Sequence, residues 1–153
     1  MASNRHLGRI VALQTLYEYE FRISAEDKSA SVDDILNRNL GRYDQEIEDT
    51  DFVEKLVQGV LNHQDELDDK IRPLAPEWPL EQIARIDRNV LRVGLYELLY
   101  LAAQVPPKVA INEAVELAKA FGSDNSSKFI NGVLGTAYRT LVEESADAST
   151  EVQ

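Results

Sequence analysis

Residues 108–134 carry two helical patterns joined by a short polar segment, and this arrangement limits the fold more than any other stretch of the chain. Apolar side chains recur there at steps of three and four residues, which is the spacing of one helix face. The first stripe comprises Val109, Ala114, Val115, Ala118 and Phe121, and the second comprises Phe129, Ile130, Val133, Leu134 and Ala137. We expect both stripes to be mainly core. The chain should turn at residues 121–129, here called the hinge, where Gly122 would end the first helix at a positive φ. The candidate caps for the second helix are Ser123, Asp124 and Asn125.

The same periodicity runs through the rest of the chain and predicts an all-α protein of about seven helices. The expected helices cover about 7–22, 32–40, 46–62, 64–72, 80–103 and 107–121, with a last helix to about 141. No segment alternates apolar and polar residues, so no strand is expected. Three prolines within 73–79 interrupt the pattern and predict a subdomain boundary at 74–79. The segment 143–153 is acidic, lacks apolar anchors and is expected to be disordered.

The formal net charge of −11 argues against a general nucleic-acid-binding protein. The acids are unevenly distributed, because residues 44–69 hold ten acids and one lysine, and residues 143–153 hold four acids. The rest of the chain therefore carries a net charge of +2, so a basic face is still available. The density of acids in 44–69 is typical of a solvated face and not of a paired acid–base site.

Several classes of site are missing from the sequence. Cysteine does not occur, which excludes disulfides and thiolate metal sites. His6 and His63 are the only histidines, neither stands in a metal-binding spacing, and we expect both to face solvent. The glycines form no phosphate-binding motif, and no nucleophile has the partners of a catalytic triad. The sequence therefore predicts that the protein is not an enzyme and has no metal or cofactor.

The first residues and the most apolar run bear on location. The start of the chain has no apolar segment of the kind that a secretion signal requires. The run 90–105 is interrupted by Arg92 and Glu97 and is too short for a membrane span. We therefore expect a soluble, cytoplasmic protein with no membrane contact.

Two positively charged or anion-attracting regions are candidates for phosphate binding. Arg5, His6 and Arg9 stand at the start of the first helix, with the two arginines four residues apart on one face. Arginine makes forked contacts to phosphate and stacks on unpaired bases. Arginines at this spacing are, however, more often part of an ordinary helix start with solvated charges. The hinge is the second candidate, because the free N–H groups and the dipole of a helix N-terminus favour an anion.

Two further clusters have both a functional and a structural interpretation. Tyr17, Tyr19 and Phe21 could form a base-stacking platform, but helical spacing more often puts such a cluster in the core. In that case Tyr17 lies on the apolar stripe and Tyr19 is the more exposed. Charges alternate in sign along a later helix at Glu81, Asp87, Arg88 and Arg92. They suit a docking surface for a protein, although pairing along the helix, as between Glu81 and Arg85, is favoured.

Three segments of the chain resemble the NusB family of transcription antitermination factors, in the family's order and with compatible spacing. They read RIVALQTLYEYEF at 9–21, IDRNVLRVGLYELLY at 86–100, and VPPKVAINEAVELAKAFG at 105–122 followed by SSKFINGVL at 126–134. The resemblance covers about residues 5–141 and implies an all-α fold of two packed helical bundles. These would form one NusB-like domain of residues 1–142, with an N-terminal bundle at about 5–73 and a C-terminal bundle at about 80–142.

The resemblance also implies a function. Family members bind the boxA sequence of nascent RNA, especially in ribosomal RNA leaders, together with NusE, a ribosomal small-subunit protein. The complex helps RNA polymerase to resist termination, and no reaction is catalysed. By position, the single-stranded RNA would meet Arg5, His6, Arg9, Phe121, Gly122, Asn125, Ser126 and Phe129. The NusE surface would comprise Tyr17, Glu81 and Asp87.

Two departures from the family's pattern bear on affinity. His6 and Leu7 stand where further basic residues are common, which should weaken RNA binding. Asn125 stands where an acid is often found, which should relieve repulsion of the RNA. We therefore expect modest affinity for RNA alone and stronger binding with NusE.

Two other functions are weighed against this one. A protein–protein adaptor with the NusB fold and little RNA affinity of its own is the alternative, which the acidic total and the thin basic N-terminus favour. The RNA-binding domain of a ribosomal RNA methyltransferase shares the fold, but we expect no such enzyme, because no methyl-donor-binding domain is present. Whether the free protein is a monomer or a homodimer that hides the RNA surface stays open.

Overall fold

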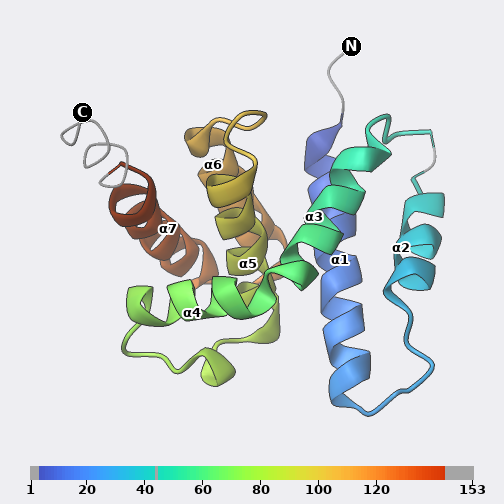
Figure 1. Ribbon diagram of the computed structural model, residues 1–153, viewed down its shortest axis with the longest axis horizontal. Helices are drawn as coiled ribbons and strands as arrows, with labels where there is room; N and C mark the ends of the chain where they lie inside the picture. The colour runs from blue at the N-terminus through green and yellow to red at the C-terminus, as the bar shows by residue number, and fades with distance from the viewer. Residues whose placement is uncertain (1–3, 44, 144–153) are drawn as a thin grey trace. The chain divides into compact units, whose positions relative to one another are not determined.

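The computed structural model describes residues 4–43 and 45–143 and divides into two compact units, residues 1–62 and residues 63–153. The described part of the chain forms seven α-helices, one short 3₁₀ helix and a terminal π-helical segment, without a strand (Figure 1). The prediction of an all-α fold with about seven helices is confirmed. None of the described helices is both long enough and apolar enough to cross a membrane. Of the predicted acidic tail, only Glu143 falls within the described residues.

The first unit is built on its first helix. It consists of α1 (Arg5–Ser24), α2 (Val32–Gly41) and α3 (Thr50–Asn62), and α1 packs against both of the others (Figure 1). Its core is made of side chains at helical spacing, namely Val11, Leu13, Leu16, Ile35, Leu36, Phe52, Val53, Leu56, Val57 and Val60. The third helix starts at Thr50 and not at the predicted Glu46, because Asp49 Oδ1 accepts the Phe52 N–H at 3.1 Å.

A buried hydrogen bond between two side chains joins α1 and α2 in this unit. Asn39 on α2 donates from Nδ2 to the Thr15 hydroxyl on α1 at 3.1 Å, and both residues are buried. A buried polar group that loses its partner costs free energy. The bond therefore favours the one packing of α2 on α1 in which the two side chains meet.

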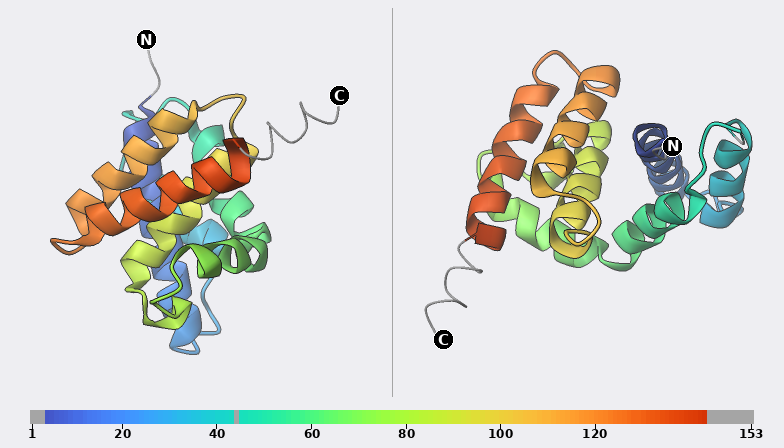
Figure 2. Two further views of the ribbon diagram at one scale, coloured as in Figure 1. Left: turned by 90° about the vertical axis from the view of Figure 1, so that its left-hand side faces the viewer. Right: turned by 90° about the horizontal axis from the view of Figure 1, so that it is seen from above.

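The second unit is arranged around α5. It consists of α4 (Gln64–Leu74), η1 (Leu80–Gln82), α5 (Arg85–Tyr100), α6 (Pro107–Phe121), α7 (Ser126–Ala137) and η2 (Tyr138–Glu143). The central helix packs against α4, α6 and α7, and α6 and α7 run side by side (Figure 2). Its glycine, Gly94, permits this close packing, since a Cβ there would lie 2.6 Å from Leu134 Cδ1 and 3.2 Å from Ala114 Cβ. The largest buried side chains are Leu67, Ile71, Leu91, Leu95, Leu117, Ile130 and Leu134.

The single helix predicted over 80–103 is divided in the structure. The 3₁₀ turn η1 is followed by Ile83 and Ala84 in extended conformations before α5 begins. Arg88 on α5 donates from Nη1 to the carbonyl oxygens of Leu80 at 3.3 Å and Ile83 at 3.0 Å. These bonds reach back from the helix to carbonyls that precede it, so the guanidinium stabilises the break.

The boundary between the units lies between Asn62 and His63, whereas the sequence placed the break between bundles at 74–79. The difference comes from α4, which packs against α5 and α7 and so belongs to the second unit. The Asp68 carboxylate on α4 also accepts hydrogen bonds from the Arg92 guanidinium on α5 at 2.8 and 2.9 Å. The proline-rich segment is thus a connection within the second unit.

One of the two histidines does not face solvent as expected. His6 is exposed, but His63 is half-buried beside the rings of Tyr100 and Tyr96, with ring centroids 4.4 and 5.7 Å away. The Tyr100 hydroxyl donates to the Glu66 carboxylate at 2.5 and 2.6 Å from its two oxygens. This hydrogen bond raises the pKa of Tyr100, because it stabilises the protonated phenol.

The stripes that define the two helices around the hinge are only partly buried. Val133 and Leu134 on α7 are buried, as expected. Val109 on α6 is 42% exposed and Val115 is half-buried, so the prediction of a core position is wrong for Val109. The buried face of α6 instead comprises Ala110, Ala114, Leu117 and Ala118, and Val109 stands beside that face in the first turn.

Candidate functional site

Gly122 closes α6 at the hinge, but for a reason that the sequence did not indicate. Its φ is −93°, so the prediction of a positive φ is wrong. The site requires glycine for space, because a Cβ there would lie 2.5 Å from Ser126 Oγ and 2.8 Å from the Ala118 carbonyl oxygen. The hinge is therefore formed by the close approach of Ser126 to the end of α6.

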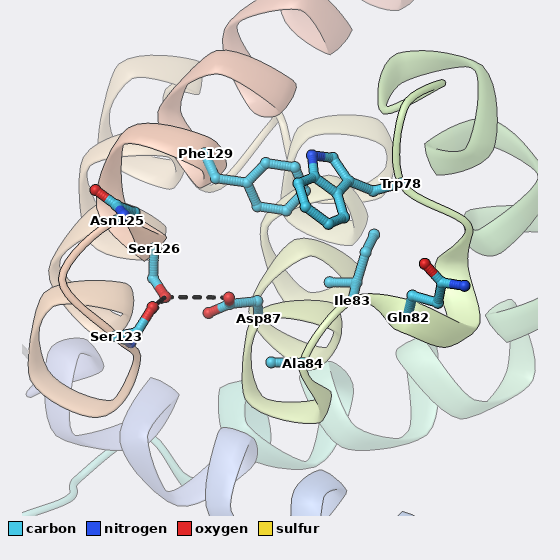
Figure 3. Close-up of a pocket in the computed structure, with 9 residues that line it drawn as sticks. All are labelled: Trp78, Gln82, Ile83, Ala84, Asp87, Ser123, Asn125, Ser126 and Phe129. Carbon is cyan, nitrogen blue, oxygen red and sulfur yellow. Dashed lines mark hydrogen bonds between the residues drawn. The ribbon is translucent and has the colours of Figure 1, made fainter.

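Ser126 is the first residue of α7 and is only 2% exposed. Its hydroxyl accepts the Ser123 N–H at 2.9 Å and donates to Asp87 Oδ2 at 3.0 Å (Figure 3). The hydroxyl is thus engaged inside the unit and shapes the hinge. Asn125 takes the N-cap position, yet within the described part of the chain its side chain makes no capping bond.

A pocket of about 370 Å³ opens beside the hinge, within the second unit (Figure 3). It is lined by Trp78, Gln82, Ile83, Ala84, Asp87, Ser123, Asn125, Ser126 and Phe129. Only one oxygen of the Asp87 carboxylate is used by Ser126. The other, Oδ1, is buried and has no hydrogen-bond partner among the described residues. The pocket therefore combines apolar and aromatic walls with the carboxylate of Asp87 and the side chains of two serines.

The outer side of the hinge presents groups that suit an RNA strand. Phe121 is 40% exposed, Asn125 is exposed, and Phe129 is half-buried. Lys128, which the sequence analysis did not single out, is exposed in the first turn of α7. The first N–H groups of a helix have no partner within the helix and favour an anion. An ammonium group at the same place adds to that attraction.

The basic residues at the N-terminus differ in exposure. Arg9 is 3% exposed, and its guanidinium carbon lies 5.1 Å from the centre of the Phe52 ring. The Arg5 guanidinium carbon lies 4.5 Å from the same ring centre, and its Nη2 is 3.4 Å from the Asp49 carboxylate. The Arg5 side chain keeps 30% of its surface exposed, and His6 is exposed. Arg5 and His6 are thus accessible to a ligand, whereas Arg9 is buried within its unit.

The residues predicted to meet a protein partner are also placed differently from the expectation. Tyr17 is 38% exposed while Tyr19 is half-buried, which reverses the expected order. Glu81 is exposed and lies 3.8 Å from Arg72. It belongs to η1 and not to α5, so the expected pairing with Arg85 along one helix does not apply.

The structure gathers four of the predicted site residues in one pocket. They are Asp87, Asn125, Ser126 and Phe129, of which the first was assigned to the protein partner and the others to RNA. The predicted residues on α1 belong to the other unit. Trp78 was missed, although it is the only tryptophan and stands in the proline-rich break. It lines the same pocket and is 56% exposed.

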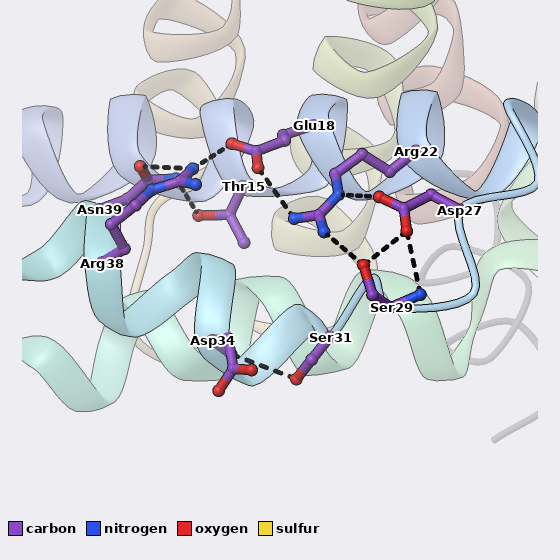
Figure 4. A network of polar contacts seen from close by, with 9 residues as sticks. All are labelled: Thr15, Glu18, Arg22, Asp27, Ser29, Ser31, Asp34, Arg38 and Asn39. Carbon is purple, nitrogen blue, oxygen red and sulfur yellow. Dashed lines mark hydrogen bonds and ion pairs between the residues drawn. The ribbon is translucent and has the colours of Figure 1, made fainter.

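A second polar cluster ties α1 to α2 in the first unit (Figure 4). Glu18 accepts hydrogen bonds from Arg38 and, at 3.3 Å, from Arg22, and the bond from Arg38 lowers the pKa of Glu18. Asp27 accepts from the Ser29 hydroxyl at 2.6 Å and from Arg22 Nε at 2.8 Å, which lowers the pKa of Asp27 to about 2. The cluster is a structural link between helices. Among the described residues, no three His, Asp or Glu side chains are grouped to hold a metal ion.

Comparison with known proteins assigns the chain to a family. The model of the NusB family matches residues 6–139. The transcription antitermination protein NusB of Dehalococcoides mccartyi (strain CBDB1) is 42% identical over 143 residues, which cover 94% of this chain and 95% of that protein. The structure of T. maritima NusB matches with a TM-score of 0.79 at 31% identity, covering 92% of this chain and 94% of that one. A crystal structure of antitermination factors NusB and NusE in complex with dsRNA shares the fold, with a TM-score of 0.74 at 24% identity and coverage of 88% and 96%.

Proposed function

The chain belongs to the NusB family, and from that premise we propose that it is an RNA-binding transcription antitermination factor. In this proposal it binds boxA-type single-stranded RNA of ribosomal RNA leaders together with NusE, as part of the RNA polymerase antitermination complex. Its family is one of antitermination factors, so the chain is not an enzyme. We also propose that the protein is cytoplasmic, because RNA polymerase and the nascent transcript are found there.

The observation that carries the proposal is the chemistry of the hinge. An exposed aromatic ring, Phe121, stands at the end of α6, and an exposed cation, Lys128, stands at the start of α7. Single-stranded RNA is typically held by bases stacked on aromatic side chains and by cations and backbone N–H groups at its phosphates. The hinge supplies all three kinds of group within a few residues of chain.

The predicted RNA-binding residues fall into two groups, those that would contact the RNA and those that would support the contacts. We assign direct contacts to Arg5, His6, Phe121, Asn125 and Phe129, which all keep exposed or half-exposed surface, and we add Lys128, which was not predicted. Arg9, Gly122 and Ser126 would act indirectly, because the first and the last are buried and the glycine gives Ser126 room to approach. Loss of these three should affect RNA binding through the shape of the surface.

NusE is the proposed protein partner, and it would meet Tyr17, Glu81 and Asp87. The two acids suit a basic ribosomal protein, since complementary charges speed encounter and fix register. One solved structure of the same fold contains NusB, NusE and double-stranded RNA, and for this chain both partners are part of the proposal.

The alternative function is a protein–protein adaptor with little RNA affinity of its own. The burial of Arg9 favours it, because only one arginine of the predicted N-terminal pair then remains at the surface. A homodimer that hides the RNA surface would give the same weak binding to RNA. Sedimentation of the free protein separates these two cases, since only the homodimer sediments as twice the monomer mass.

Titration of labelled boxA RNA, with and without NusE, tests the proposal. We expect wild-type protein to bind RNA modestly alone and more tightly with NusE. Arg5→Ala should weaken binding and reduce the slope of log affinity against log salt by about 0.7, the value for one phosphate contact on a single strand. Arg42→Ala, which removes an exposed arginine after α2, serves as the control and should leave both quantities unchanged. No RNA binding in either condition would support the adaptor.

A further inference from the structure

Trp78 has no role in the proposed function, although its ring stands at the wall of the pocket beside the hinge. The side chain is 56% exposed and lies in the connection between α4 and η1, and Phe129 on α7 forms the opposite wall. The two rings point toward one another from the two sides of the pocket (Figure 3). Among the described residues they nevertheless make no ring contact with each other. Burial of an aromatic ring is favourable, so the exposed ring of Trp78 is a position where another flat group would be stabilised.

The edge of the pocket carries two side-chain amides. Gln82 lies on the side of Trp78 and Asn125 on the side of Phe129 (Figure 3). Both residues are exposed, and within the described part of the chain neither amide has a hydrogen-bond partner. A side-chain amide offers both donor and acceptor atoms, which is the combination that pairs with the polar edge of a nucleobase. The pocket therefore presents flat aromatic surface together with uncharged hydrogen-bonding groups.

The size and the charge of the pocket indicate how a nucleotide would enter it. Its volume of about 370 Å³ is within the range of small-molecule sites. Among the described residues that line it, only Asp87 is charged. The carboxylate would repel a phosphate but not a neutral base. A nucleotide would therefore enter with its base first, and its phosphate would stay at the outer side of the hinge, where Lys128 and the first N–H groups of α7 are located.

We propose that Trp78 is a base-binding residue: one unstacked base of the bound single-stranded RNA enters the pocket, stacks on Trp78 beside Phe129, and turns its polar edge to Gln82 and Asn125. This inference rests on the proposed function and adds Trp78 and Gln82 to the RNA contacts. Proteins that hold single-stranded nucleic acid typically stack its bases on aromatic side chains. The cations of the hinge would hold the strand, and the pocket would fix its register by binding one nucleotide.

Removal of the ring is the direct test. Stacking of one base on an aromatic side chain corresponds to about a 5- to 150-fold change in affinity. Because Trp78 is more than half exposed, we expect Trp78→Ala to weaken boxA binding in the absence of NusE by about fivefold, the lower end of that range. The slope of log affinity against log salt should stay at the wild-type value, since no phosphate contact is lost. Tyr100→Ala removes an exposed ring of the same unit outside the pocket, and this control should bind as wild type.

Three further variants separate stacking from a structural role. Trp78→Phe keeps a ring and should retain most of the affinity, whereas Trp78→Leu keeps apolar volume without a flat face and should bind as weakly as Trp78→Ala. Gln82→Ala changes the pocket without changing either ring, and it should weaken binding by about fivefold through the loss of one hydrogen bond. An unfolding curve for each variant verifies that it is folded. Equal affinities for Trp78→Phe and Trp78→Leu would contradict stacking.

Modified RNA identifies the nucleotide that enters the pocket. An abasic nucleotide is placed at each position of boxA RNA in turn, and each RNA is titrated with wild type and with Trp78→Ala. At one position, loss of the base should weaken wild type and should cost Trp78→Ala nothing further, because both changes remove the same contact. At the other positions the two losses should multiply. Losses that multiply at every position would overturn the inference.

The outcomes separate the inference from the proposed function. If wild type binds no boxA RNA with or without NusE, both are refuted. If wild type binds RNA and Trp78→Ala binds it equally well, the inference is refuted and the proposed function stands. If Trp78→Ala retains its affinity for RNA alone and only the effect of NusE is reduced, the pocket holds a protein side chain, which also overturns the inference.

Discussion

Asp68 on α4 and Arg92 on α5 form a buried ion pair with two parallel hydrogen bonds, 2.8 Å from Nε to Oδ1 and 2.9 Å from Nη2 to Oδ2. Only 10% of the aspartate side chain and 4% of the arginine side chain are exposed. Each charge has been taken out of water, and the two hydrogen bonds between them offset part of that cost. This pair is one reason that α4 packs in the second unit.

Removal of one partner should therefore be costly. We predict that Asp68→Ala lowers the free energy of unfolding by about 3–5 kcal/mol, because the Arg92 charge stays buried and loses two charged hydrogen bonds. Asp69→Ala is the control on the same helix, since Asp69 pairs with Arg72 at the exposed surface, and its cost should be below about 1 kcal/mol. Urea unfolding measures both values, and equal small losses would contradict the role given to the buried pair.

Two glycines of the hinge and α7 should respond in opposite directions to the same substitution. At Gly122 an added Cβ would collide with Ser126 and with the Ala118 carbonyl, so Gly122→Ala should destabilise by about 1–3 kcal/mol. At Gly132, inside α7, nothing lies within 4 Å of the added Cβ. Gly132→Ala should stabilise by about 0.5–1 kcal/mol, because alanine is the better helix former. Thermal unfolding of the two variants decides the matter, and a stabilising Gly122→Ala would be inconsistent with the close approach at the hinge.

The cluster between α1 and α2 predicts a dependence of stability on acid pH. The pKa of Asp27 falls from its ordinary value of 3.8 to about 2 in the folded chain. The unfolded chain therefore binds the proton more readily, so the contribution of Asp27 to stability is complete above about pH 4 and is lost as pH falls towards about 2. Accordingly, the difference in unfolding free energy between wild type and Asp27→Asn should shrink over that range. Glu54→Gln, at an exposed acid on α3, provides the comparison, and a difference that stays constant with pH would exclude the mechanism.

Lys128 should contribute to RNA binding through a phosphate contact. Lys128→Gln is expected to weaken boxA binding and to lower the slope of log affinity against log salt by about 0.7. Lys108→Gln neutralises an exposed lysine at the other end of α6 and should change neither value. Fluorescence anisotropy at several salt concentrations gives the slope for both variants. If Lys128→Gln has the same slope as wild type, Lys128 does not contact an RNA phosphate.

The positions of most helices could be predicted from the sequence, because the spacing of apolar residues within a short segment is enough to indicate a helix. The apolar stripes on α3 and α7 predicted both helices, although α3 begins at Thr50 and not at Glu46. The prolines after α5 ended that helix near the expected place. The break before α5 was missed because it depends on one side chain, Arg88, that reaches back to the carbonyls of Leu80 and Ile83. Hydrogen bonds of this kind cannot be predicted from the spacing of apolar residues.

Charged side chains were the hardest to place. Asp68 lies in the acidic segment that looked like a solvated face, yet its partner, Arg92, is 24 residues away and could not be identified from spacing. Arg9 was predicted at the surface, although it stands three, four and seven residues before Ala12, Leu13 and Leu16 on the buried stripe. The signal for its burial was therefore present in the sequence. The contact between Asp87 and Ser126 joins residues 39 apart and required the fold.

Trp78 makes occupation of the pocket detectable by intrinsic fluorescence. It is the only tryptophan of the chain, and its ring is 56% exposed at the wall of the pocket. Indole emission changes in wavelength and intensity when the ring exchanges water for another molecule. Occupation of the pocket should therefore alter the intrinsic fluorescence of the unlabelled protein, and the signal would come from this one position.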